Sequence, residues 1–187
     1  MRVISGKYAK RNLYTLKSQK TRPTSDKVKE SLFNSLGQFF EGGEVLDLYG
    51  GSGALAIEAV SRGCSHATII DINYQAVEII RKNVALTKEE DRFSVYKMSS
   101  NAALTKLAKD EKKFDLVFLD PPYAKQKIAS DMKKMDSLNL LTDNAVIVAE
   151  TDDETNLGEI EGFELTKTHH LGKTIVRFYR IYRKEKR

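Results

Sequence analysis

The stretch EVLDLYGGSGALAIEAVSRG, residues 44–63, places a short apolar run, three glycines and a helical pattern in immediate succession. The apolar run predicts a buried strand, and the pattern of residues 54–63 predicts a helix that Gly63 ends. Glycines between a strand and a helix let the backbone turn tightly and approach a ligand closely. Together these features predict a strand–loop–helix unit of the kind that binds nucleotides.

Strand and helix patterns alternate along the rest of the chain. Apolar runs of strand length occupy residues 67–72, 93–98, 114–120 and 145–151, and helical patterns separate them at 74–87, 102–109 and 125–138. Continuous Val, Ile and Leu runs between helices are typical of a parallel sheet covered on both faces. Only two residues separate the last two runs, 163–171 and 174–183, so these must form an antiparallel hairpin. The sequence therefore predicts an α/β, Rossmann-like fold with a seven-stranded, mostly parallel sheet and a C-terminal antiparallel hairpin.

A segment of different composition precedes this alternation. Residues 1–22 mix β-branched, aromatic and basic side chains, and predict a basic N-terminal β-hairpin extension. Residues 22–40 predict a helix, because the Thr-Ser-Asp sequence at 24–26 can cap its start and apolar residues follow at helical spacing. No linker-like composition interrupts the remainder. We expect a single domain over residues 1–187, with residues 23–187 as its α/β core.

Positive charge is concentrated at the amino end. The net charge is +5, and residues 1–29 alone hold nine Lys or Arg against one acid. Lys and Arg bind phosphates and release counterions, so a basic arm on a nearly neutral domain indicates a polyanionic partner such as nucleic acid. The alternative is a solvated face that only keeps the protein soluble.

The glycine loop indicates a nucleotide site. Gly51 and Gly53 fit a dinucleotide-binding fingerprint, and Asp71 follows about 20 residues later, where an acid binds ribose hydroxyls. Asp47, near the end of the preceding strand, argues against a pyrophosphate, because its carboxylate would repel the phosphates. It favours a cationic ligand without phosphate, such as S-adenosylmethionine. An NAD-dependent oxidoreductase and a turn without ligand are the alternatives.

A second unusual stretch is FDLVFLDPPY, residues 114–123, in which an apolar strand ends in an acid, two prolines and a tyrosine. The carboxylate of Asp120 and the carbonyl of Pro121 can accept both N–H groups of an exocyclic amine and so orient its lone pair. The prolines keep these acceptors rigid, and Tyr123 offers a ring on which a flipped base can stack. Ligands of open α/β sheets bind at the carboxyl ends of the strands, so we expect this loop and the glycine loop to serve one pocket. A simple proline turn is the alternative.

With these motifs the sequence resembles a known family. The segments LDLYGGSGALAIEAVSRG, DINYQAVEIIRKN and FDLVFLDPPY look like the DPPY-type, S-adenosylmethionine-dependent amino-methyltransferases of class I. MRVISGKYAKRNL and RPTSDKVKESLFN narrow the likeness to the RsmD-type 16S rRNA guanine-N2 methyltransferases of bacteria, along essentially the whole chain. The last segment is the more specific, since the DPPY motif alone does not separate DNA adenine from RNA guanine enzymes.

The resemblance implies roles for individual residues. It assigns cofactor binding to Asp47, Tyr49, Gly51, Ser52, Gly53, Asp71, Ile72 and Asn101. It assigns the guanine amine to Asp120, Pro121, Pro122 and Tyr123, and substrate RNA to Lys10, Arg11, Arg22 and Thr24. Asn101 stands where many relatives have an aspartate facing the adenine amine, and its amide oxygen still accepts that hydrogen bond, though more weakly. Asp71 stands where this family often has Glu, and Tyr49 where the usual loop begins with glycine.

The expected function is transfer of the methyl group of S-adenosylmethionine to N2 of a flipped guanine in small-subunit rRNA, either free or in an assembling 30S subunit. Alternatives are an adenine-N6 methyltransferase, the oxidoreductase above, and a non-catalytic RNA-binding module. The three histidines lack metal-ligand spacing, so no metal is expected. The single cysteine and the lack of a long apolar run favour the cytoplasm and no membrane span.

Overall fold

The computed structural model describes residues 1–17, 25–122 and 124–183. The chain divides into two compact units, Met1–Ser100 and Asn101–Arg187, which are described separately below. The expectation of a single domain therefore stays a prediction. No helix in the described part of the chain is both long and apolar enough to cross a bilayer.

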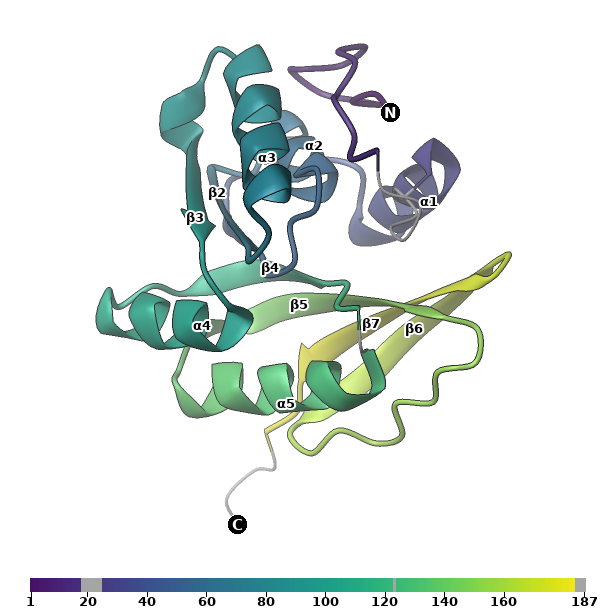
Figure 1. Cartoon of the computed structure of the whole chain (residues 1–187). Helices are drawn as coiled ribbons and strands as arrows, with labels where there is room; N and C mark the ends of the chain where they lie inside the picture. The colour runs from purple at the N-terminus through teal and green to yellow at the C-terminus, as the bar shows by residue number, and fades with distance from the viewer. Residues whose placement is uncertain (18–24, 123, 184–187) are drawn as a thin grey trace. The chain divides into compact units, whose positions relative to one another are not determined.

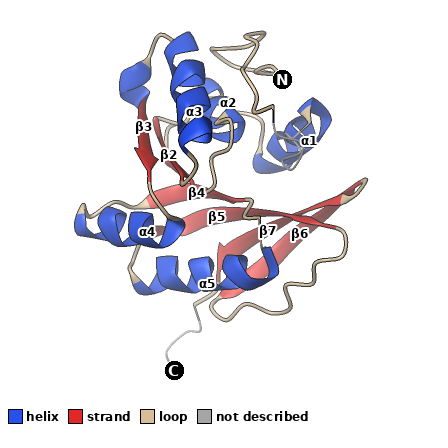
Figure 2. Ribbon diagram, viewed as in Figure 1, coloured by secondary structure: helices blue, strands red, loops and turns tan. Residues whose placement is uncertain are grey.

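The first unit carries the glycine loop. Its elements in chain order are α1 (Asp26–Leu36), β1 (Glu44–Asp47), α2 (Ala54–Ser61), β2 (His66–Asp71), α3 (Tyr74–Leu86), the 3₁₀ helix η1 (Glu90–Arg92) and β3 (Phe93–Lys97). The strands run parallel in the order β3-β2-β1. Figures 1 and 2 label β2 and β3, with helices α2 and α3 next to them. Helix α2 packs on β1 and β2, and α3 packs on β2 and β3. Strands β1 and β2 are mostly buried, as their apolar composition predicts, whereas β3 is largely half-buried.

The second unit carries the Asp-Pro-Pro segment. Its elements are α4 (Ser100–Lys109), β4 (Phe114–Leu119), α5 (Ala124–Ser137), β5 (Leu141–Asp152), β6 (Phe163–Leu171) and β7 (Thr174–Ile181). The strand order is β4-β5-β7-β6, with β4 parallel to β5 and with β7 antiparallel to both of its neighbours. The seven predicted strands and the C-terminal antiparallel hairpin are thus confirmed among the described residues, and with them the α/β class (Figure 2).

Helix α1 is shorter than its sequence predicted. Ser25 caps its start, because its hydroxyl accepts the Val28 N–H at 3.2 Å, as the capping pattern predicted. The helix ends at Leu36 rather than near residue 40, because Gly37 adopts a left-handed φ of 110°. Phe40 still packs edge-on against Phe33, with ring centroids 6.4 Å apart. The apolar residues beyond the helix therefore belong to a loop that folds back on it.

The N-terminal extension differs from the predicted β-hairpin. Its chain does pair with itself in antiparallel fashion, but through one isolated bridge between Arg2 and Asn12 instead of through two strands. The Val3 N–H donates to the Arg11 carbonyl at 2.9 Å, and Lys10 turns the chain with a φ of 71°. Much of the backbone of this segment bonds to helices α2 and α3, so its amide groups are satisfied without a strand ladder.

A buried carboxylate attaches this extension to the first unit. Glu58 of α2 has no exposed surface, and its two oxygens accept the backbone N–H groups of Ile4 and Ser5 at 3.0 and 3.1 Å. The same carboxylate pairs with Lys29 of α1 at 3.3 Å and with Arg62 at 2.9 Å. One side chain therefore joins the N-terminal segment, α1 and α2.

Candidate functional site

The glycine loop follows β1 with a backbone that requires glycine. Gly51 and Gly53 have φ values of 61° and 80°, in the left-handed region that other residues rarely adopt. The Gly50 N–H donates to the Ile70 carbonyl at 2.7 Å, and a Cβ on Gly50 would lie 2.5 Å from an Ile69 methyl carbon. The loop thus lies directly against β2 and leads into the start of α2, where Gly53 is the N-cap.

Asp71, at the end of β2, forms a hydrogen bond with this loop. One of its carboxylate oxygens accepts the Gly51 N–H at 2.9 Å, and the other accepts the Asn73 N–H at 2.9 Å. A carboxylate has about four acceptor positions, so both oxygens retain capacity for ribose hydroxyls. Ile72 follows and is 68% exposed, which leaves an apolar surface beside the carboxylate. This pair of residues suits a nucleoside, with hydroxyls on Asp71 and a base near Ile72.

Asp47 lies at the end of β1 and is only 3% exposed. This carboxylate would attract a cationic ligand group and repel a phosphate. Tyr49 and Ser52 are half-buried in the loop that follows. The cofactor-binding roles of Asp47, Tyr49 and Ser52 stay predictions.

Asn101 opens the second unit on α4. Its side-chain oxygen accepts from the Lys134 ammonium at 2.5 Å, and the same ammonium reaches the Asn101 carbonyl at 3.0 Å and the Thr105 hydroxyl at 3.1 Å. The predicted acceptor for the adenine amine is therefore shared with a lysine of α5. An amide oxygen has two lone pairs, so the predicted role stays open to it.

Asp120 directly follows β4, in which every residue except Asp115 is buried. Its side chain is exposed at the surface, yet the protein surrounds the carboxylate closely enough that desolvation raises its pKa from 3.8 to about 6. The group is therefore mostly ionised at neutral pH and becomes protonated in mild acid. An ionised acceptor open to a ligand is what the orientation of an amine requires.

The two prolines after this acid differ in environment. Pro121 is buried and Pro122 is exposed at the turn before α5. The ring of Pro121 fixes its φ, and Pro122 restricts the ψ that sets the direction of the Pro121 carbonyl. Tyr123, the predicted stacking residue, lies outside the described residues.

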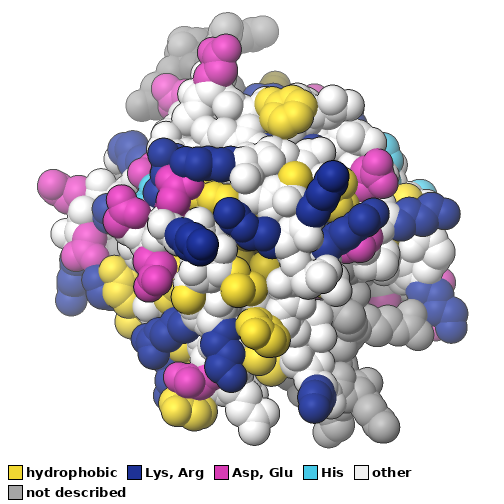
Figure 3. Space-filling view, turned by 90° about the horizontal axis from the view of Figure 1, so that it is seen from above, with side chains coloured by type: hydrophobic (Ala, Val, Ile, Leu, Met, Phe, Trp, Pro, Cys, Tyr) yellow, Lys and Arg dark blue, Asp and Glu magenta, His cyan; other side chains and the backbone are white. Residues whose placement is uncertain are grey.

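The residues predicted to contact RNA also differ in their exposure. Lys10 is exposed on the N-terminal segment, whereas Arg11 is half-buried with its guanidinium 5.2 Å from the centre of the Tyr8 ring. Within the described residues, one terminal nitrogen of Arg11 is buried without a hydrogen-bond partner. Arg22 and Thr24 lie outside the described residues. Figure 3 shows Lys and Arg side chains on one face of the molecule, interspersed with Asp, Glu and exposed hydrophobic side chains.

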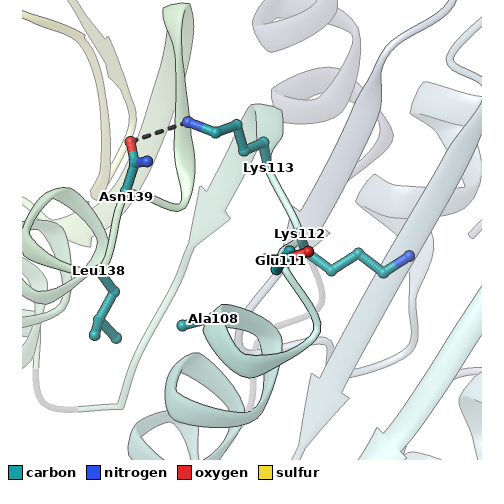
Figure 4. Close-up of a pocket in the computed structure, with 6 residues that line it drawn as sticks. All are labelled: Ala108, Glu111, Lys112, Lys113, Leu138 and Asn139. Carbon is teal, nitrogen blue, oxygen red and sulfur yellow. Dashed lines mark hydrogen bonds between the residues drawn. The ribbon is translucent and has the colours of Figure 1, made fainter.

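A recess of about 230 Å³ lies elsewhere in the second unit (Figure 4). It is lined by Ala108, Glu111, Lys112, Lys113, Leu138 and Asn139. These residues precede β4 or follow α5, so the recess is at the amino end of β4, while Asp120 is at its carboxyl end. The recess therefore does not contain the predicted amine-binding residues. In the described ranges no three His, Cys, Asp or Glu side chains cluster as metal ligands would.

Sequence reasoning missed Asn83. This side chain on α3 is completely buried and donates to the Ser52 carbonyl of the glycine loop at 2.8 Å. Ile80, one turn earlier on the same face, lies against Gly53 of that loop. An asparagine on the buried face of an apolar helix was the available signal, since such a polar group needs buried partners.

Known proteins are similar to this chain over nearly its whole length. Residues 1–180 match the family model described as conserved hypothetical protein 95. YlbH of Bacillus subtilis is 40% identical over 181 residues, which cover 96% of this chain and 98% of YlbH. The ribosomal RNA small subunit methyltransferase D of Haemophilus influenzae is 32% identical over 179 residues, 96% of this chain and 93% of that protein. The structure of yhhF from Escherichia coli, assigned as a methyltransferase, has a TM-score of 0.84 and 27% identity over 98% of this chain and 99% of its own.

Proposed function

This chain belongs to the family described as conserved hypothetical protein 95, that of the RsmD-type rRNA methyltransferases, and on this premise we propose that it methylates N2 of a guanine in small-subunit rRNA. The chain is an S-adenosylmethionine-dependent rRNA methyltransferase with the α/β fold of that class. The choice of guanine N2, the assembling 30S subunit as the form of substrate, and the cytoplasm as the place of action are parts of the proposal. The observation that supports the choice of substrate is the similarity to the ribosomal RNA small subunit methyltransferase D of Haemophilus influenzae over 96% of this chain. The carboxylate of Asp120 before two prolines supports an exocyclic amine as the methyl acceptor.

For the cofactor, we assign the residues of the glycine loop and the ends of β1 and β2. S-adenosylmethionine, when bound, supplies a methyl group activated by a sulfonium charge. Asp47 would face the cationic part of the cofactor, and Gly51 and Gly53 would let the backbone approach its amino acid part. Asp71 would accept from the ribose hydroxyls, for which its oxygens keep capacity. Tyr49, Ser52 and Ile72 would line this site, and Asn101 of the second unit keeps its predicted role as an acceptor for the adenine amine.

For the substrate, we assign the amine to the segment after β4. The lone pair of an exocyclic amine is delocalised into its ring, so the amine is a poor nucleophile until its N–H groups are gripped. The Asp120 carboxylate and the Pro121 carbonyl would accept these two N–H groups and direct the lone pair, which is catalysis by positioning. Pro122 would stiffen the turn and Tyr123 would stack on the base. Asp120 is not needed as a strong base, because the amine loses its proton readily once it is alkylated.

For the RNA, we assign Lys10 and Arg11, together with Arg22 and Thr24. Basic side chains on an exposed segment hold the phosphate backbone, and their contribution falls as salt rises. The target base would have to leave its stack, as it does for other enzymes that modify bases.

The test is methyl transfer from tritiated S-adenosylmethionine to small subunits or 16S rRNA from a strain that lacks this protein, followed by nucleoside analysis. We expect N2-methylguanosine as the labelled product. Asp120→Ala should abolish turnover but leave the unfolding transition and cofactor binding unchanged. N6-methyladenosine as the product would favour the adenine alternative, and full activity of Asp120→Ala would refute the proposed role of this carboxylate.

A further inference from the structure

Asn83 makes three hydrogen bonds with two segments that are far apart in the sequence. Its side-chain oxygen accepts the Tyr14 N–H at 2.8 Å. Its side-chain nitrogen donates to the Tyr14 carbonyl at 3.0 Å and to the Ser52 carbonyl at 2.8 Å. The side chain has no exposed surface, so water cannot replace any of these partners. One buried amide therefore joins the N-terminal segment to the glycine loop.

The chemistry of this junction requires an amide. The partners comprise one donor and two acceptors, and a primary amide offers an acceptor oxygen and two N–H donors in one rigid plane. Aspartate could accept from Tyr14 but could not donate to either carbonyl, and leucine could do neither. Rotation of the amide to follow one segment would break its bonds to the other, so the positions of Tyr14 and Ser52 depend on each other.

Both ends of the junction lie in parts of the molecule that meet ligands in the proposed function. Ser52 stands between Gly51 and Gly53 in the cofactor loop. Tyr14 follows Lys10 and Arg11 on the basic segment and is 54% exposed. Its backbone N–H and its carbonyl are both hydrogen-bonded to the Asn83 side chain. An exposed aromatic ring on a fixed backbone is a surface on which an unpaired base can stack.

We propose that Asn83 is a positioning residue that couples the N-terminal segment to the cofactor loop, so that RNA bound to that segment tightens cofactor binding. This inference rests on the proposed function. When RNA holds Tyr14 in place, the Asn83 amide stays in the orientation that fixes the Ser52 carbonyl. Coupling between two sites is reciprocal, so the cofactor must tighten RNA binding by the same factor.

The experiment measures binding and does not depend on turnover. Radiolabelled S-adenosylhomocysteine is titrated in equilibrium dialysis, alone and with saturating 16S rRNA from a strain that lacks this protein. We expect the RNA to tighten its binding about fivefold in the wild type, and to change it by less than a factor of two in Asn83→Leu. In the reverse titration, S-adenosylhomocysteine should tighten RNA binding by the same factor in the wild type, and by less than a factor of two in Asn83→Leu.

Ser61→Ala is the matched control. The Ser61 hydroxyl accepts the Tyr8 N–H at 2.9 Å and donates to the Ser5 carbonyl at 2.7 Å, so it holds the same segment but does not touch the glycine loop. This variant should lose stability and keep the fivefold factor. Should Asn83→Leu not fold, Asn83→Ser removes the bridge with a smaller polar side chain. A purely structural role would lower the unfolding temperature of the Asn83 variant and leave its factor unchanged.

Two results overturn the coupling. One is an Asn83 variant in which RNA tightens S-adenosylhomocysteine binding as much as in the wild type. The other is a wild-type protein that binds S-adenosylhomocysteine and methylates RNA, but in which RNA does not change the affinity for S-adenosylhomocysteine. If the wild type binds no S-adenosylhomocysteine at all, the proposed function fails together with the coupling.

Discussion

The buried carboxylate of Glu58 provides the sharpest prediction about stability. Its two oxygens accept from four donors, namely the N–H groups of Ile4 and Ser5 and the charged groups of Lys29 and Arg62. In Glu58→Gln the side chain keeps its size but has one acceptor oxygen, and its NH₂ group faces donors. At least two hydrogen bonds are lost, and two buried cations keep no anion between them.

The expected loss follows from this geometry. Removal of one partner of a buried ion pair costs about 3–5 kcal/mol, because the remaining charge stays buried without compensation. Lys29 and Glu58 are both fully buried. We therefore expect Glu58→Gln to lower the free energy of unfolding by about 4 kcal/mol. For a chain of this length that corresponds to a fall of about 12 °C in the melting temperature.

The pH dependence of this loss distinguishes the charge from simple packing. Burial lowers the pKa of Lys29 below 10.5, while the Coulombic attraction of Glu58 raises it. Between the lowered pKa and 10.5 the unfolded chain binds more protons than the folded one, so stability rises with pH. Without Glu58 the pKa of Lys29 falls further and this range extends to lower pH. The deficit of Glu58→Gln should therefore shrink as the pH is raised towards 10.5.

The assay is urea unfolding followed by circular dichroism at neutral pH and at increasing pH towards 10.5. Glu30→Gln on the exposed face of α1 is the control, and we expect it to change stability by less than about 0.5 kcal/mol. Lys29→Met added to Glu58→Gln should recover part of the loss, since it removes one uncompensated charge. A loss below 1 kcal/mol in Glu58→Gln, or a deficit that does not depend on pH, would show that the ion cluster does not hold the N-terminal segment in place.

Two further predictions concern the N-terminal segment and the amine-binding acid. Gly6→Ala should cost about 2 kcal/mol in urea unfolding, because Gly6 has a φ of 89° and an added Cβ would lie 1.9 Å from the Ser61 carbonyl oxygen. Gly158→Ala, at a φ of 61° with open space around it, is the control and should cost less. The kcat/KM of the wild type should fall tenfold per pH unit below about pH 6, because protonation of Asp120 removes the ionised acceptor. A profile that is flat between pH 5 and pH 8 would contradict the role of this carboxylate.

Features that depend on neighbouring residues were predictable from the sequence. The glycine loop was predictable because a strand, glycines at left-handed positions and a helix all lie within residues 44–63. The Ser25 cap and the C-terminal hairpin were too, since capping and tight turns involve residues only two to four positions apart. The end of α1 was misplaced because apolar spacing continues past Gly37, although the backbone does not.

The candidate site was predictable only in part. Asp71 lies against the glycine loop as its spacing indicated, and Asp120 stands exposed at the end of its strand. The bond between Asn101 and Lys134 was not foreseen, because the two residues lie on different helices and are 33 positions apart. The raised pKa of Asp120 likewise depends on how much protein surrounds it, which its sequence neighbours do not determine.

By itself, then, the sequence determined the order of elements, the glycine loop and the acid–proline segment, because local backbone preferences and the period of apolar residues specify them. Only the tertiary structure decided how the N-terminal segment is held. Glu58 bonds to residues 53 and 54 positions away, and Asn83 bonds to Tyr14 across 69. Burial makes those bonds obligatory, since a polar group without water must find a partner wherever the fold places one. That requirement gave the extension its looped form in place of the two strands that its composition predicted.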